Sequence, residues 1–106
     1  MGKLEDIHRP KPRLGQVVQI LRGRDAGQYA VVVGVVDVKF VNLADGYKRK
    51  FNRPKKKNIR HVRLEDYVNA EVASSLHEQG KVTNVKLRYA LEQFHLRRLH
   101  EEKKGE

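Results

Sequence analysis

The sequence predicts a mostly β fold with a C-terminal α-helical part: a small antiparallel barrel followed by a two-helix extension. The chain has 106 residues, of which 39% are hydrophobic, enough for one domain with a modest core. Residues 15–64 contain several short β-branched segments separated by turn signals, which is typical of a small antiparallel barrel. After Leu64 the apolar residues recur at the spacing of an amphipathic helix.

The first two strands are predicted at residues 15–22 and 28–38. In the first strand Val18 and Ile20 share a face, because side chains alternate along a strand. The second strand is rich in valine and apolar on both faces, so it is either central in a closed barrel or bent so that each face is covered in turn. Gly34 interrupts it, as a sharp bend at a barrel corner would. A helix over this run is disfavoured because valine is stiff at χ1.

Two more strands complete the predicted barrel. The third is predicted at residues 39–43, and we assign its Phe40 to the core. Asp45-Gly46 follows, a strong short signal for a hairpin turn. The last strand is predicted at residues 59–64, which again combine β-branched and polar positions.

Two helices are predicted after the barrel. Glu65-Asp66 resemble the negative first turn of a helix, and Gly80 is a suitable C-terminal stop. Thr83 caps the second helix, which we expect to run to Leu99 before the charged tail frays. Six apolar side chains are expected to pack on each other and on the barrel: Val68, Val72, Leu76, Leu87, Leu91 and Phe94. The alternative is that the two helices fold only on a ribosome or another partner.

These patterns divide the chain into three parts. Residues 1–13 contain two prolines and no clear periodicity, so we expect a flexible basic lead-in. Residues 14–66 form the predicted barrel, and residues 67–106 the helical extension with its frayed tail.

Positive charge is concentrated in the barrel half of the chain. The formal net charge is +10, with +11 in residues 1–64 and −1 in residues 65–106. The segment 47–64 carries nine cationic side chains and no acidic one. Like charges this close repel each other, and a bound polyanion would remove that cost. The alternative interpretation is a solvated loop that keeps the protein soluble, although evenly mixed charge would serve that purpose as well.

The sequence offers little for catalysis or for metal binding. It has no cysteine, no pair of histidines at zinc-helix spacing and no Gly-Lys-Ser/Thr phosphate loop. Its two serines do not lie in a nucleophile elbow. The longest apolar run, residues 30–36, is too short to span a membrane. We therefore expect a cytoplasmic protein that is not an enzyme, without cofactor, metal, small-molecule substrate or membrane association.

One segment resembles a known motif. Residues 18–27, followed by the valine-rich strand, look like a KOW motif, which pairs a strand with a glycine-containing loop and a returning strand. Gly27 matches the characteristic glycine of the motif, while Val18, Ile20 and Val32 match its core positions.

The continuation of this segment narrows the resemblance. Residues 44–46, the cations at 48–50, residues 53–58 and His61-Val62 resemble the fourteen-e family of archaeal and eukaryotic large-subunit ribosomal proteins. They also resemble the small bacterial KOW-domain RNA-binding proteins. The likeness covers about half of the chain. It implies an SH3-like barrel that binds RNA, as these ribosomal proteins do within the large subunit.

The candidate RNA-binding residues lie in two basic loops. They are Arg22, Arg24, Lys48, Arg49, Lys50, Arg53, Lys55, Lys56, Lys57, Asn58 and Arg60. Three glycines, Gly23, Gly27 and Gly46, are expected to shape these loops, Gly27 with a positive φ. Lysines would meet phosphates as point charges, and arginines would fork onto phosphates or stack on bases. Tyr47 or Phe51 would stack on an unpaired base, or else, with Tyr29, pack in the core or at the barrel rim.

The leading hypothesis is an RNA-binding protein associated with the ribosome and translation, which reads structured RNA mainly through phosphates. The alternative is a protein-interaction module that recruits an acidic partner or dimerises through the C-terminal helices. A DNA-binding role is weaker, because no helix carries its basic residues on one face.

Overall fold

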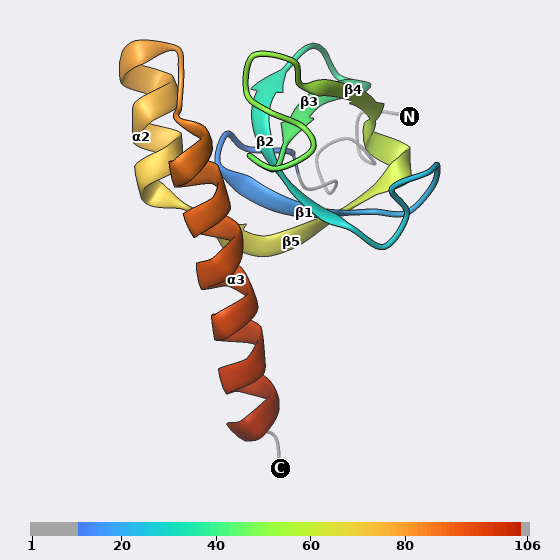
Figure 1. The fold of residues 1–106 in the computed structure, drawn as a ribbon. Helices are drawn as coiled ribbons and strands as arrows, with labels where there is room; N and C mark the ends of the chain where they lie inside the picture. The colour runs from blue at the N-terminus through green and yellow to red at the C-terminus, as the bar shows by residue number, and fades with distance from the viewer. Residues whose placement is uncertain (1–10, 105–106) are drawn as a thin grey trace.

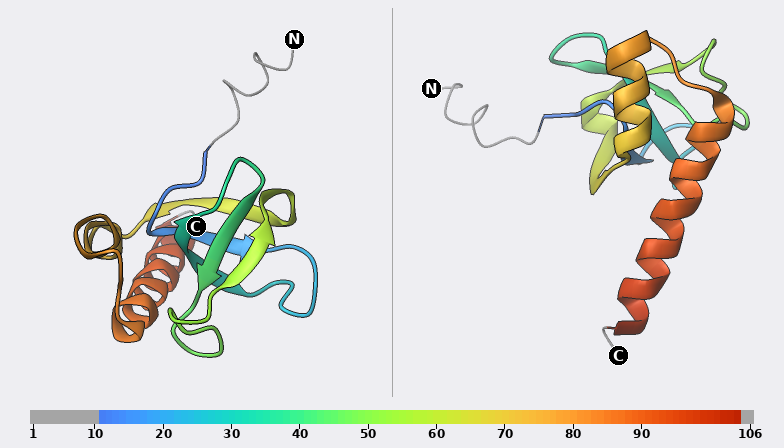
Figure 2. Two further views of the ribbon diagram at one scale, coloured as in Figure 1. Left: turned by 90° about the horizontal axis from the view of Figure 1, so that it is seen from above. Right: turned by 90° about the vertical axis from the view of Figure 1, so that its left-hand side faces the viewer.

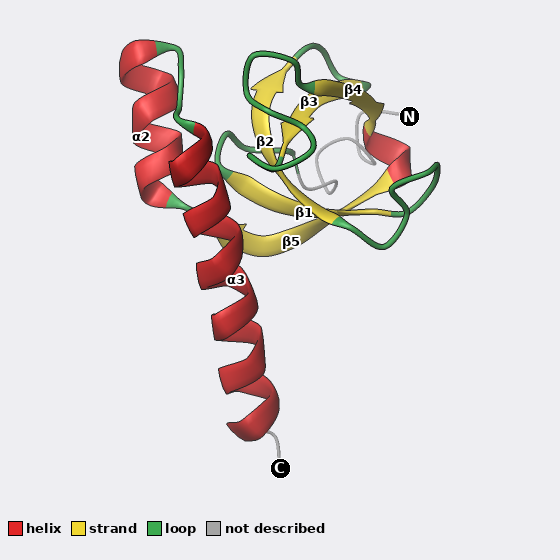
Figure 3. Ribbon diagram, viewed as in Figure 1, coloured by secondary structure: helices red, strands yellow, loops and turns green. Residues whose placement is uncertain are grey.

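The computed structural model describes residues 11–104, which form a five-stranded antiparallel sheet followed by two helices (Figure 1). The strands are β1 (Gln16–Ile20), β2 (Tyr29–Val35), β3 (Phe40–Ala44), β4 (Lys55–Asn58) and β5 (Val62–Val68). A 3₁₀ turn, η1 (Ile59–His61), joins β4 to β5, and α2 (Ala70–Gln79) and α3 (Asn84–Lys104) follow. The strand order is β4-β3-β2-β1-β5. This confirms the predicted fold class (Figure 3).

The sheet curls into a small barrel, and the view from above shows the two helices beside it rather than across its ends (Figure 2). Side chains that point inward form one apolar cluster, the inner core. It consists of Val18, Ile20, Ala30, Val32, Val41, Leu43 and Val62. Val18 and Ile20 of β1 share this face, as the alternation of side chains predicts.

A second apolar cluster, the outer core, lies between the sheet and the helices. The sheet contributes Val17, Val31, Val33 and Ala44, and the helical part contributes Val72, Leu76, Val82, Leu87, Ala90, Leu91 and Phe94. β2 is apolar on both faces because one face lines the barrel and the helices cover the other. The register of β2 against β3 shifts between Val32 and Gly34, at the glycine where the sequence predicts a bend.

The helix boundaries follow local capping chemistry. The side chain of Asn69 accepts a hydrogen bond from the Val72 amide (2.9 Å) at the start of α2. Gly80 ends α2 in the left-handed conformation with a φ of 70°. The hydroxyl of Thr83 accepts from the Lys86 amide (3.2 Å) at the start of α3. The predicted stop at Gly80 and cap at Thr83 are therefore confirmed.

The transition from strand to helix comes later than predicted. β5 continues to Val68, so Glu65, Asp66 and Val68 are strand residues and not the start of a helix. Val68 pairs with Gln16 of β1, and the Gln16 side chain donates to the Glu65 carbonyl at 3.0 Å. These long-range bonds extend the strand until Asn69, where a capping side chain lets the helix begin.

Three further predictions need correction. Phe40 is not in the core: it is partly exposed on the outer face of β3, with the Lys56 ammonium 4.6 Å above its ring. Residues 59–61 form a 3₁₀ turn, so the last strand begins only at Val62. α3 continues through Lys104 instead of ending at Leu99, because its last turns keep helical backbone bonds and an Arg97–Glu101 ion pair supports them. Within residues 11–104, no helix is long and apolar enough to cross a membrane.

Candidate nucleic-acid interface

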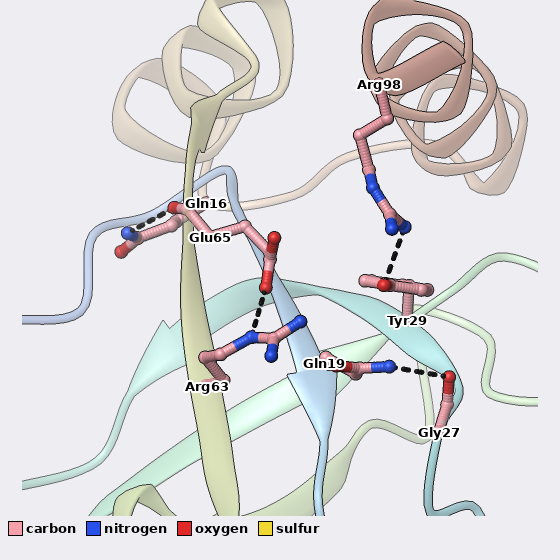
Figure 4. Close-up of polar contacts among 7 residues, drawn as sticks. All are labelled: Gln16, Gln19, Gly27, Tyr29, Arg63, Glu65 and Arg98. Atoms are coloured by element: carbon pink, nitrogen blue, oxygen red, sulfur yellow. Dashed lines mark hydrogen bonds and ion pairs between the residues drawn. The ribbon is translucent and has the colours of Figure 1, made fainter. Parts of the chain in front are cut away.

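The β1–β2 loop, residues 21–28, carries Arg22 and Arg24 on a tightly hydrogen-bonded turn. Gly27 has a φ of 90°, as predicted, and its amide donates to the Ile20 carbonyl at 2.7 Å. The Gln19 side chain donates to the Gly27 carbonyl at 3.3 Å (Figure 4). Both arginines are exposed. The loop therefore presents two cations to solvent from a fixed support.

The β3–β4 loop, residues 45–54, begins with the predicted Asp-Gly turn. The Asp45 carboxylate accepts hydrogen bonds from the amides of Tyr47 (2.8 Å) and Arg49 (2.9 Å). The amides of Asp45 and Gly46 in turn donate to the Arg49 carbonyl. The turn is thus closed by its own side chain, as is usual for aspartate. Because it leads into a longer loop, Asp45-Gly46 does not join two strands as a two-residue hairpin.

The helix α3 holds this loop in place. The Arg88 guanidinium donates to the Gly46 carbonyl at 2.7 Å, and the Phe51 amide donates to the Asn84 side chain at 2.8 Å. The Phe51 ring packs against the outer core. Sequence reasoning missed Asn84 and Arg88 because both contacts join residues far apart in the chain.

The three consecutive lysines lie on β4 and not in a loop, which corrects the prediction. Lys55 pairs with Leu43 and Lys57 with Val41, so these two lysines start from the inward face of the barrel. Lys56 points to the opposite face, against Phe40. The Lys57 ammonium donates to the Arg22 carbonyl at 2.7 Å. This bond connects β4 to the β1–β2 loop.

The remaining candidate residues lie in the β3–β4 loop or where β4 meets η1. Lys48, Lys50, Arg53 and Arg60 are exposed, and Arg49 is partly buried. The Asn58 side chain accepts from the Arg60 amide at 2.9 Å and caps η1, so its oxygen has a structural partner. We call the cations of both loops and of β4 the basic end of the barrel. They are Arg22, Arg24, Lys48, Arg49, Lys50, Arg53, Lys55, Lys56 and Lys57.

Within residues 11–104 no carboxylate lies within 4.0 Å of any cation of the basic end. The ion pairs lie elsewhere: Arg63–Glu65 on β5, Lys86–Glu71 between the helices and Arg97–Glu101 along α3. The hydrogen bond from Arg63 to Glu65 raises the pKa of the Arg63 guanidinium (Figure 4). Among residues 11–104, the helices therefore form no ion pair with the basic end.

The three aromatic side chains near the loops have different environments. Tyr29 packs on Phe94 and His95 of α3, and its hydroxyl accepts from Arg98 at 2.6 Å (Figure 4). Phe51 packs on the outer core. Tyr47 is 53% exposed, with the Arg88 guanidinium 5.7 Å from its ring centre. Tyr47 is thus the one of these three rings that remains open for stacking on a base.

No group of three or more potential metal ligands occurs in the part of the chain that the structure describes. The basic end presents ammonium and guanidinium groups, most of which are exposed. Such groups suit phosphates and the flat faces of bases.

Two comparisons with known proteins bear on this geometry. The KOW motif family model matches residues 14–43, which cover β1, the β1–β2 loop, β2 and most of β3. A protein of Bacillus subtilis (strain 168), named "Putative ribosome-binding protein YbzG", is 44% identical over 71 residues. The match covers 67% of this chain and 96% of the relative. The chain belongs to the KOW-domain proteins.

The β1–β2 loop and its flanking strands have the features expected of the KOW motif. In this KOW-domain protein Gly27 takes the positive φ expected of the motif's characteristic glycine. Val18, Ile20 and Val32, the predicted core positions of the motif, all lie in the inner core. The β3–β4 loop and the helices that hold it lie outside the residues matched by the family model.

Proposed function

We propose that this KOW-domain protein is a ribosome-associated RNA-binding protein that contacts structured RNA mainly through phosphates. The observation that carries the proposal is the basic end of the barrel, whose cations have no acidic partner within residues 11–104. The name of the Bacillus subtilis relative, which states ribosome binding, supports the same conclusion. Of the three rings near the two loops, only Tyr47 is open for stacking, which favours recognition of RNA shape over reading of successive bases.

The rigidity of the basic end adds to this support. The Lys57–Arg22 bond joins β4 to one loop, and α3 fixes the other loop through Arg88 and Asn84. Pro54 restricts the chain just before β4. Preorganised cations lose less conformational entropy on binding than cations on a mobile loop.

Salt dependence tests the phosphate mechanism. If five phosphates are neutralised, the logarithm of the affinity for a hairpin RNA should fall with the logarithm of salt concentration at a slope of roughly −3.5 to −4.5. Fluorescence anisotropy over a salt series measures this slope. A slope near zero would exclude binding led by phosphates.

A charge variant tests the place of binding. Replacing Lys48, Lys55 and Lys56 by glutamine should make the slope shallower by about 2 to 3, because each lost phosphate contact contributes roughly 0.7 to 0.9. These lysines are chosen because Lys57 also binds the Arg22 carbonyl. The matched control replaces Lys81, Lys86 and Arg97, which lie on the helical side. An equal loss in both variants would mean that net charge, and not the basic end, determines binding.

Sedimentation of cell extract tests the association with ribosomes. The protein should travel with large ribosomal subunits at low salt and leave them at high salt, as expected of a complex led by phosphate contacts. The variant of Lys48, Lys55 and Lys56 should leave the subunits at lower salt than the helical control. Sedimentation of the wild-type protein apart from ribosomes at every salt concentration would contradict this part of the proposal.

One observation favours a second candidate function, the binding of a protein partner. Four large apolar side chains of α3 are exposed: Val85, Tyr89, Leu96 and Leu99. Figures 1 and 2 show the C-terminal half of α3 extending away from the barrel. Sedimentation equilibrium of the RNA-free protein distinguishes a dimer from a monomer. A dimer lost in a Leu96→Glu/Leu99→Glu variant would support this function without affecting RNA binding at the basic end.

A further inference from the structure

The Tyr47 side chain is exposed on the β3–β4 loop, which lies beside the first turns of α3 (Figure 2). The backbone on both sides of its Cα is fixed to the rest of the loop and to the helix. The Tyr47 amide donates to the Asp45 carboxylate at 2.8 Å, and the carbonyl of the preceding Gly46 accepts from the Arg88 guanidinium at 2.7 Å. The loop therefore presents this ring from an anchored position.

Arg88 contacts the ring as well as the loop backbone. Its guanidinium carbon lies over the Tyr47 ring, 5.7 Å from the ring centre. A Cβ on Gly46 would lie only 2.9 Å from the Arg88 Cγ, so the stem of the arginine lies close against the loop. Arginine suits this double contact because its planar group stacks on aromatic rings and still donates hydrogen bonds. Arg88 therefore ties the ring to α3, while about half of the Tyr47 side chain remains open to solvent.

An exposed aromatic ring suits a base better than a phosphate. The faces of the ring are apolar and carry partial negative charge, which disfavours contact with a phosphate. A base stacks on such a face, and every base offers one. Lys48 and Lys50 are exposed next to Tyr47 in the sequence and suit the phosphates on either side of a stacked base. Residues 47–50 thus offer partners for both parts of a nucleotide.

We propose that Arg88 of α3 positions Tyr47 to stack on one unpaired base of the bound RNA, an inference that rests on the proposed function. A ring that is ordered before binding loses less conformational entropy when the base arrives. Unpaired bases in loops and bulges can turn outward onto an aromatic side chain, whereas paired bases stack on one another. The protein should therefore prefer RNA with an unpaired nucleotide. A helix outside the residues matched by the KOW model contributes to this preference.

Three hairpin RNAs of the same stem test the proposal: one fully paired, one with a bulged adenosine and one with an abasic nucleotide at the bulge. The abasic bulge keeps the phosphates and removes only the base. In fluorescence anisotropy at one salt concentration, the bulged adenosine should bind at least about fivefold more tightly than the abasic bulge. This is the low end of what one base stacked on an aromatic side chain contributes. Equal affinity for the two bulges would overturn the stacking and leave phosphate binding intact, whereas failure to bind any hairpin would contradict the proposed function.

Variants of Tyr47 locate the stacked base. Tyr47→Ala should bring the affinities for the adenosine and abasic bulges together, and Tyr47→Phe should keep them apart because a phenyl ring still stacks. Tyr89→Ala is the matched control, since Tyr89 of α3 is also 53% exposed. It should leave the difference between the two bulges unchanged. An unchanged difference in Tyr47→Ala, or an equal loss in Tyr89→Ala, would overturn the assignment of the base to Tyr47.

Variants of Arg88 test its positioning role. Arg88→Met removes the cation and the donor, and should lower the ratio of adenosine-bulge to abasic-bulge affinity about two- to fivefold, the effect of one exposed cation–π contact. Arg88→Lys keeps a cation and should restore part of this ratio. Lys86→Met removes the same charge from a nearby position of α3 and should leave the ratio unchanged. Binding of the fully paired hairpin shows that each variant is folded. A wild-type ratio in Arg88→Met, or a lower ratio in Lys86→Met, would overturn the role of Arg88.

Discussion

Gly27 and Gly46 both have a positive φ, yet their surroundings differ. At Gly27 an added Cβ would meet nothing within 4 Å, so only the backbone conformation requires glycine. At Gly46 the Cβ would lie 2.5 Å from the Asn84 carbonyl oxygen and 3.2 Å from the Leu87 Cβ. Gly46 is therefore needed both for the turn at the start of the β3–β4 loop and for the close approach of this loop to α3.

Alanine substitutions at these two glycines should separate the two requirements. Gly27→Ala should lower the free energy of unfolding by about 1 to 2 kcal/mol, the cost of the left-handed conformation. Gly46→Ala should cost roughly a further 1 to 3 kcal/mol, because the loop and the helix must move apart. Urea denaturation of both variants measures the difference. Equal losses would mean that the loop adjusts freely to the extra methyl group.

At the scale of elements, α3 acts as the support of the β3–β4 loop. Asn84→Ala removes the acceptor of the partly buried Phe51 amide, and the loss of such a hydrogen bond costs about 0.5 to 1.5 kcal/mol. The amides of residues 46–53 should therefore exchange with solvent faster, and affinity for hairpin RNA should fall because the cations are less ordered. Glu92→Ala, at an exposed position of α3, is the control and should change neither property. Unchanged exchange in Asn84→Ala would contradict the supporting role.

The stability that the contact between α3 and β2 contributes should depend on pH. Desolvation of the His95 ring, which contacts Tyr29 and Phe94, together with the charge of Arg98, lowers the pKa of His95 below its usual value of 6.5. The unfolded chain then binds a proton before the folded chain does, so stability is lost as pH falls below about 6.5. Thermal unfolding of wild-type and His95→Gln protein from about pH 8 to pH 5 measures this loss. It should be smaller in the variant, and identical pH profiles would contradict the assignment.

Local sequence explains the elements whose determinants are local. β-Branched residues predicted β1 and β2, and capping residues predicted the end of α2 and the start of α3. β4 was missed because lysine has a low strand propensity, and its pairing with β3 decides its conformation. Phe40 was placed in the core by its hydrophobicity, although register puts it on the outer face. Of the candidate site, the cations were predicted, but the support of the β3–β4 loop by α3 depends on long-range contacts.

At the scale of the whole molecule, one sheet contributes to two apolar clusters. One face of the sheet lines the barrel, and the helices pack on the other face. β1 and β2 contribute to the inner core on one face and to the outer core on the other. We therefore predict that the helices are part of the folding unit and are ordered before any partner binds.

Truncation tests this shared core. Removal of residues 70–106 would expose Val17, Val31 and Val33 to water, and burial of one such side chain stabilises a fold by about 1.5 to 3 kcal/mol. The shortened chain should lose native tertiary structure, seen as poor dispersion of its amide NMR signals. Removal of residues 101–106 is the control and should leave the fold intact. A well-dispersed spectrum of the shorter fragment would show that the barrel folds alone.

The docking of the β3–β4 loop on α3 has a thermodynamic consequence in the reverse direction. If the helix orders the loop for its ligand, then the ligand must stabilise the loop–helix contact by the same coupling free energy, because linkage is reciprocal. Amide protons in the first turns of α3 would report occupancy of the barrel's basic end. The change in amide exchange of α3 on ligand binding would therefore measure the coupling free energy between the helix and the basic end.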